Sequence, residues 1–248
     1  MPSTTIADRF RCMLTVTWFL FSLLLSSLVL TIVMILTLGK AQNFMVKYIG
    51  LFVGRTGLTI AGIKLVVHNP NSLPDRPVMY IFNHSSTLDL FVLLSLGLHN
   101  VRFVAKREFQ LNPFFFILGN LTGQIFIPRD KSQRSVQILK KACDRIKKKK
   151  LSMVMGPEGS RKHPGVIGPF KKGAFYLACD LSYPIVPLYF ENASELCQGR
   201  SLITKKGTVN AYIHPAIETA SWNRDEVAHH VKQIRNQYLK WANVLDTA

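Results

Sequence analysis

An uncharged stretch near the amino terminus constrains the fold of this chain more than any other feature. Residues 13–38 form a run of 26 residues without Asp, Glu, Lys or Arg. As one α-helix the run would be about 39 Å long, against about 30 Å for the hydrocarbon core of a bilayer. Basic residues lie on both sides of it, so the positive-inside rule gives no orientation. We therefore expect a helix that either spans a membrane or dips into one leaflet.

A second apolar segment, residues 44–53, follows after a short break. The two segments together predict a helical hairpin whose two ends lie on the same side of the membrane. A cleaved signal peptide fits less well, because the apolar run is too long and residues 39–41 are a poor cleavage site. We predict that residues 1–57 form a membrane-associated helical pair, integral or monotopic. The remaining residues, 58–248, are expected to form a second domain and to face the cytoplasm.

The rest of the chain alternates between short apolar runs and amphipathic segments. Strands are predicted at residues 58–68, 78–82, 101–105, 124–127, 151–155, 184–190 and 208–214, and helices at 88–98, 113–118, 131–150 and 171–179. This alternation predicts an α/β domain with a mainly parallel, mixed central sheet flanked by helices. Ligands of such sheets bind beyond the carboxyl ends of the strands.

The loop after the strand at 78–82 carries the most specific chemistry. It reads Asn-His-Ser-Ser-Thr-Leu-Asp at residues 83–89 and leads into an apolar helix. One helical turn can bring Asp89 to one ring nitrogen of His84, which leaves the other nitrogen open. A His oriented by an Asp, with no nucleophile beside it, suits a general base that deprotonates a substrate hydroxyl. The same residues also fit a simpler interpretation, in which Asp89 only caps the helix.

Positively charged residues are expected at the same edge of the sheet. Lys106, Arg129 and Arg161 each follow a predicted strand, and Glu158 precedes Arg161 in the loop after the strand at 151–155. Three cations at three strand ends predict a phosphate pocket, since Arg binds phosphate bidentately. Taken singly, each cation is more often a surface charge, and Glu158 could simply pair with Arg161.

The charge balance restricts the possible partners. Lys and Arg number 31 against 14 Asp and Glu, a formal net charge of +17, which favours anionic partners. Aromatic residues lie inside apolar runs instead of among basic residues, so we expect no nucleic-acid partner. The four cysteines lack metal-site spacing, and HExxH, P-loop, GxGxxG and GxSxG motifs are absent from the sequence. We therefore expect neither a metal nor a bound cofactor.

Four blocks resemble the glycerolipid acyltransferase family, in the family's order. Residues 83–89 resemble its HxxxxD motif, 124–130 its second block, 156–161 its PEGTR-type third block and 183–190 its fourth block. Two positions depart from the family pattern. Gly156 stands where many relatives have an aromatic residue, and Ser160 replaces a common Thr.

The resemblance implies a 1-acylglycerol-3-phosphate acyltransferase in a membrane. Such an enzyme transfers an acyl chain from acyl-CoA or an acyl-acyl-carrier-protein to the sn-2 hydroxyl of lysophosphatidic acid, which gives phosphatidic acid. By the family pattern His84 is the catalytic base and Asp89 orients it. The residues that would bind the glycerol phosphate are Lys106, Arg129, Glu158, Gly159 and Arg161.

Two alternatives remain open from the sequence. One is an acyltransferase for another lysophospholipid. The other is a non-catalytic membrane adaptor that binds anionic lipid through the basic segment 131–150, because each basic residue near an anionic surface contributes about 1 kcal/mol. A nucleic-acid binder is the weakest candidate, since it would require steeply salt-dependent binding.

Overall fold

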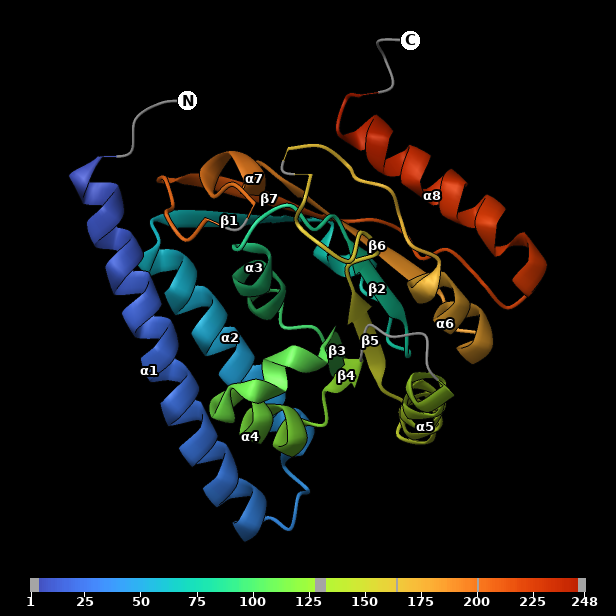
Figure 1. Ribbon diagram of the computed structural model, residues 1–248, viewed down its shortest axis with the longest axis horizontal. Helices are drawn as coiled ribbons and strands as arrows, with labels where there is room; N and C mark the ends of the chain where they lie inside the picture. The colour runs from blue at the N-terminus through green and yellow to red at the C-terminus, as the bar shows by residue number, and fades with distance from the viewer. Residues whose placement is uncertain (1–4, 128–132, 164, 200, 245–248) are drawn as a thin grey trace.

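Two long antiparallel helices begin the computed structural model, which describes residues 5–127, 133–163, 165–199 and 201–244 (Figure 1). They are α1 (Ile6–Leu36) and α2 (Gln42–Ile60), and they match the predicted helical pair. The strand predicted at 58–68 is wrong over its first residues, because α2 continues to Ile60 and β1 begins only at Ile63. The expected division of the chain at residue 57 therefore falls inside α2, and it stays a prediction.

α1 buries several small polar side chains against the protein and exposes many of its large apolar side chains. Ser22, Ser26 and Ser27 are buried against the rest of the protein, and Ser22 and Ser27 donate hydrogen bonds to carbonyl oxygens of their own helix. In contrast, Leu24 is 52% exposed and Leu28 is 58% exposed. By length and composition, α1 is the one helix within the described residues that could cross a membrane. A helix of this kind favours lipid over water as its outer environment.

A seven-stranded sheet forms the centre of the molecule. Its strands are β1 (Ile63–His68), β2 (Met79–Phe82), β3 (Val101–Lys106), β4 (Ile125–Ile127), β5 (Ser152–Met155), β6 (Ile185–Glu191) and β7 (Gly207–Ile213), in the spatial order β1-β7-β6-β2-β5-β3-β4. The pair β6–β7 is antiparallel, and every other neighbouring pair is parallel. The sheet is therefore mainly parallel and mixed, as predicted. Five of its strands, β6, β2, β5, β3 and β4, end at the same edge.

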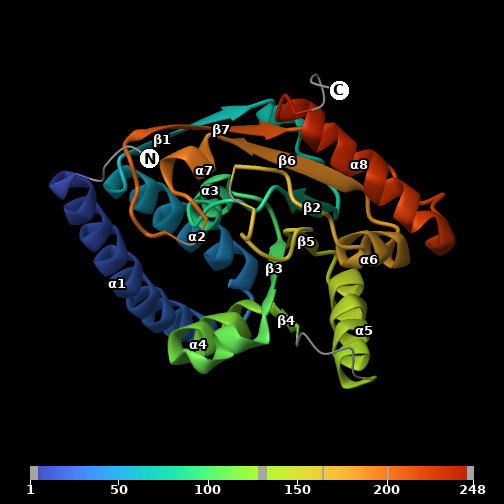
Figure 2. The ribbon, with the colours of Figure 1, turned by 45° about the horizontal axis from the view of Figure 1, so that its top comes forward.

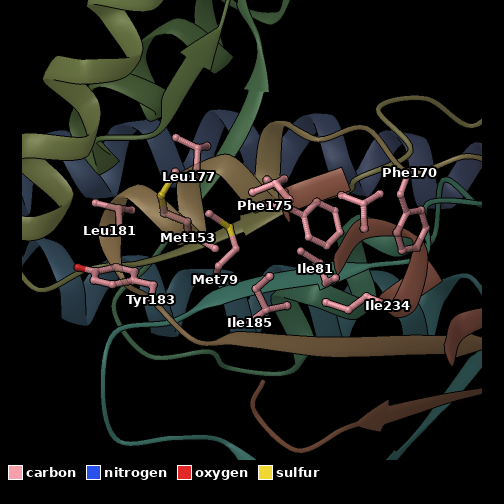
Figure 3. Packing of buried hydrophobic residues seen from close by; sticks show 14 of the residues in the cluster. Met79, Ile81, Met153, Phe170, Phe175, Leu177, Leu181, Tyr183, Ile185 and Ile234 are labelled. Carbon is pink, nitrogen blue, oxygen red and sulfur yellow. The ribbon is translucent and has the colours of Figure 1, made fainter. Parts of the chain in front are cut away.

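Helices cover both faces of this sheet (Figure 2). They are α3 (Asp89–Ser95), α4 (Pro113–Thr122), α5 (Gln133–Lys148), α6 (Gly173–Leu181), α7 (Ala193–Leu196) and α8 (Val227–Trp241). On one face α6 and α8 pack on Met79 and Ile81 of β2 (Figure 3). On the other face α2 and α3 pack on Tyr80 and Phe82. The alternation along β2 follows from the two-residue period of a strand, and it explains why this strand is apolar throughout.

Glycines on α2 allow this helix to approach α3 closely. A β-carbon added at Gly54 would lie 2.7 Å from the backbone nitrogen of Ser95, and one at Gly57 would lie 2.5 Å from the ring of Phe91. Both distances are far below van der Waals contact, so only glycine fits. This packing attaches the amino-terminal helices to the helix that begins at Asp89.

Candidate active site

Two loops that are distant in the sequence meet at the carboxyl edge of the sheet. β2 and β5 are parallel neighbours, with Ile81 paired to Met155. The loop 83–89 follows β2 and the loop 156–161 follows β5, so both leave the sheet at the same place. The arrangement matches the expected location of a ligand site in a sheet of this kind.

The expected contact between His84 and Asp89 is present. The Nδ1 atom of His84 lies 2.9 Å from Oδ2 of Asp89. The same oxygen accepts a hydrogen bond of 3.1 Å from the backbone N–H of Ser86, as an acid at the start of a helix would. Asp89 therefore combines both roles considered from the sequence. Nδ1 of His84 is occupied by this contact. Nε2 of the same ring has no hydrogen bond to any described residue, so it is open to a substrate.

Burial and hydrogen bonding act in opposite directions on the carboxyl group of Asp89. The side chain is only 1% exposed, and this desolvation raises the pKa of its carboxyl group. The hydrogen bond from His84 and its charge when protonated act in the opposite direction, as does the N–H of Ser86. When ionised, this carboxylate would stabilise a positive charge on the imidazole beside it, which is itself 26% exposed.

The loop 83–89 is fixed by hydrogen bonds that the sequence did not predict. The side-chain amide of Asn83 donates to the carbonyl of Phe190 at 2.9 Å and accepts from its N–H at 2.7 Å. The hydroxyl of Ser86 donates to the carbonyl of Cys197 at 2.6 Å. Both residues are buried. The only sequence signal for these bonds was the polar character of residues 83–89 between two apolar segments.

Glu158 joins the two loops through their backbone. Its Oε1 accepts a hydrogen bond from the N–H of His84 at 2.9 Å, and its Oε2 accepts from the N–H of Gly168 at 3.1 Å. The residue is 5% exposed, and burial raises the pKa of its carboxyl group to about 6. No ion pair between Glu158 and Arg161 exists in the described part of the chain. Its expected contact with glycerol phosphate stays a prediction.

Arg161 lies against the catalytic loop. Its Nη1 atom donates to the hydroxyl of Thr87 at 3.0 Å and approaches the carbonyl of Ser86 at 3.4 Å. Gly159, between Glu158 and Arg161, has φ of +66°, a conformation that favours glycine. The loop 156–161 thus presents a cation and a backbone without a side chain beside the His84 loop, which suits a phosphate ligand.

Two further predicted residues are placed less fully. The backbone of Lys106 lies at the end of β3, at the same edge of the sheet as His84. Arg129 lies outside the described residues. Among those that are described, no group of three or more His, Cys, Asp or Glu could hold a metal ion. The expectation that the chain needs no cofactor stays a prediction.

Comparisons with known proteins agree with this geometry. The family model described as Acyltransferase matches residues 64–191. A Homo sapiens protein, 1-acyl-sn-glycerol-3-phosphate acyltransferase beta, is 32% identical over 81% of this chain and 72% of its own length. The chain belongs to the acyltransferase family. A Saccharomyces cerevisiae 1-acyl-sn-glycerol-3-phosphate acyltransferase is 31% identical over 71% of this acyltransferase, which spans 59% of the yeast protein.

The fold of the acyltransferase is also similar to a solved structure. The 1-acyl-sn-glycerophosphate (LPA) acyltransferase PlsC from Thermotoga maritima superposes with a TM-score of 0.75 at 21% identity. The match covers 97% of this acyltransferase and 98% of PlsC, so it includes the amino-terminal helices as well as the sheet.

Proposed function

We propose that this chain is a 1-acyl-sn-glycerol-3-phosphate acyltransferase. It transfers an acyl group from a thioester, acyl-CoA or an acyl-acyl-carrier-protein, to the sn-2 hydroxyl of lysophosphatidic acid, and the product is phosphatidic acid. The observation that carries the proposal is the 2.9 Å contact between His84 Nδ1 and Asp89, which leaves Nε2 open in a loop that Arg161 contacts through Thr87. The names and similarity of the human and yeast relatives support the choice of acceptor.

The geometry supports direct transfer without an acyl-enzyme. Nε2 of His84 takes the proton of the acceptor hydroxyl while its oxygen attacks the thioester carbonyl carbon. A C–O bond forms, the C–S bond then breaks, and the departing thiolate takes the proton back from the imidazolium. Asp89 holds the ring by its Nδ1–H and stabilises the positive charge that His84 carries between the two proton transfers.

The phosphate of the acceptor would be held by cations at the strand ends. Arg161 is the described candidate, and its contact with Thr87 supports a position next to the base. Lys106 and Arg129 are the other candidates from the family pattern, with Gly159 and Glu158 completing the loop. The exposed apolar face of α1 supports attachment to membrane lipid, where a lysolipid acceptor is found. We propose that the catalytic domain faces the cytoplasm.

An acceptor panel tests this proposal. The full-length protein, purified in detergent, is assayed with radiolabelled acyl-CoA and with acyl-acyl-carrier-protein. The acceptors are lysophosphatidic acid, lysophosphatidylcholine, monoacylglycerol and glycerol 3-phosphate. We expect turnover to be fastest with lysophosphatidic acid, and His84→Ala to lose about 10²- to 10⁴-fold in kcat.

Binding to anionic liposomes serves as the control, since His84→Ala should bind them as wild type does. If the protein preferred lysophosphatidylcholine, that lipid would take the place of lysophosphatidic acid as the proposed acceptor. Wild-type binding to liposomes without any turnover would favour the membrane adaptor.

A further inference from the structure

Lys171 lies against the loop that contains Glu158 and Gly159. Its backbone N–H donates a hydrogen bond of 2.8 Å to the carbonyl oxygen of Pro157. Its side chain runs across Gly159, where an added β-carbon would lie 3.3 Å from Cδ and Cε of the lysine and 2.9 Å from Nζ. Both the backbone and the side chain of Lys171 are therefore attached to the loop 156–161.

The ammonium group of Lys171 has no anionic partner in the described ranges. No ion pair or side-chain hydrogen bond joins it to another described residue. Glu158 in the adjoining loop forms no ion pair with it, and its two oxygens accept the N–H groups of His84 and Gly168. Lys171 is exposed. A lysine whose carbon chain packs on a glycine while its charge stays in solvent is available to an anionic ligand.

Arg161 is partly engaged by the protein itself. Its Nη1 is engaged with Thr87 and approaches the carbonyl of Ser86, so part of the guanidinium group holds the catalytic loop. A phosphate monoester carries a charge of about −1.5 to −2 at neutral pH and three acceptor oxygens. Lys171 supplies a further positive charge at the same loop, beside Gly159.

We propose that Lys171 binds the phosphate of the acceptor and thereby selects a phosphomonoester over a neutral or zwitterionic headgroup. This role rests on the proposed function. The acyl donor also carries phosphate groups, so the same chemistry could come from either substrate. The acceptor is favoured because the loop 156–161 contacts the catalytic loop through Arg161 and Glu158, and the acceptor hydroxyl must reach His84 there.

Three substitutions test this role. Lys171→Met keeps the length and packing of the side chain over Gly159 but removes its charge, and Lys171→Arg keeps a charge. Lys172→Met is the matched control, because Lys172 is the next residue and is also exposed. The Michaelis constants for lysophosphatidic acid and for the acyl donor are measured separately, each at a saturating concentration of the other substrate.

We expect Lys171→Met to raise KM for lysophosphatidic acid by about tenfold or more, with kcat within about threefold of wild type. Its donor KM should stay within about twofold, and Lys171→Arg should resemble wild type. The preference in kcat/KM for lysophosphatidic acid over lysophosphatidylcholine should fall by the same factor. An effect confined to packing would not change this preference.

Three results would overturn the role of Lys171. They are an unchanged acceptor KM in Lys171→Met, an equal rise in Lys171→Met and Lys172→Met, or a rise in the donor KM alone. If wild type turns over lysophosphatidic acid and Lys171→Met is unaffected, only this inference fails. If wild type does not turn over lysophosphatidic acid at all, the proposed function fails and the role of Lys171 fails with it.

Discussion

Glu158→Gln is expected to make the protein more stable and less active. The carboxylate holds the backbone N–H of His84 and that of Gly168, one with each oxygen. Glutamine has nearly the same shape but only one acceptor oxygen, so its NH₂ group must face one of the two N–H groups. One end of the link between the catalytic loop and the loop around Gly168 is then released. We expect kcat to fall by about tenfold or more, because a small displacement of a catalytic group is costly.

The effect on stability follows from the pKa of Glu158. Burial raises this pKa to about 6 from its usual 4.5. The folded chain therefore binds the proton more tightly than the unfolded chain, so protonation favours folding. This contribution is complete below about pH 4.5 and is lost as the pH rises through about 6. The difference between the two pKa values corresponds to about 2 kcal/mol at neutral pH, since one pKa unit is about 1.4 kcal/mol.

Glutamine resembles the protonated acid and does not titrate. At pH 7.5 the free energy of unfolding of Glu158→Gln should thus exceed that of wild type by about 2 kcal/mol, and the difference should vanish near pH 4. For a chain of this length the change corresponds to a Tm higher by about 4–8 °C. Thermal unfolding of the purified protein in detergent, followed by tryptophan fluorescence across this pH range, measures it.

The control is Glu108→Gln, which removes the same charge from an exposed residue that lies outside the site. It should change the free energy of unfolding by about 0.5 kcal/mol or less at any pH. If Glu158→Gln were less stable than wild type at pH 7.5, the two hydrogen bonds would outweigh the cost of burying the charge. The argument from burial would then be wrong.

Three further substitutions address the base, the surface around it and the membrane. Asp89→Asn keeps a hydrogen-bond acceptor for His84 but removes the charge that stabilises the imidazolium, so kcat should fall by about 100-fold or more with acceptor KM unchanged in steady-state assays. Gly156→Val should lower kcat by about tenfold or more and change the preferred acyl-chain length. A β-carbon at this position would already lie 3.2 Å from Cβ of His84. Unchanged rates across a series of acyl-CoA chain lengths would contradict this prediction. Leu28→Lys on the outer face of α1 should weaken sedimentation with liposomes by about tenfold or more, whereas Leu202→Lys, which replaces an apolar residue of similar exposure outside that helix, should not.

The strands and most helices could be predicted because each has a local pattern. β2 is apolar throughout, and α4 begins at Pro113 after Asn112, whose side chain accepts the N–H of Phe114 at 2.9 Å. The boundary between α2 and β1 could not be predicted in the same way. The residues there have β-branched side chains, yet they continue a helix, and the close packing of α2 on α3 through Gly57 favours that conformation. Tertiary contact outweighed local propensity there.

The contact between His84 and Asp89 could be predicted from spacing, since only five positions separate the two residues, in a loop that ends where α3 begins. The connection through Glu158 could not, because it joins a side chain to backbone N–H groups 74 and 10 residues away in sequence. Backbone donors have no sequence pattern of their own. Only the pairing of β2 with β5 brings the two loops together, and a prediction of strand order was needed to see it.

The serines and threonines of residues 13–38 have a similar explanation. They make this segment less apolar than a typical membrane anchor. In the structure Ser22, Ser26 and Ser27 face the protein, and Leu24, Leu25 and Leu28 face outward. Small hydroxyl side chains let α1 approach the domain closely and satisfy their own hydrogen bonds within the helix. The polar residues therefore strengthen the case for lipid contact, because they leave the outer face of α1 almost wholly apolar.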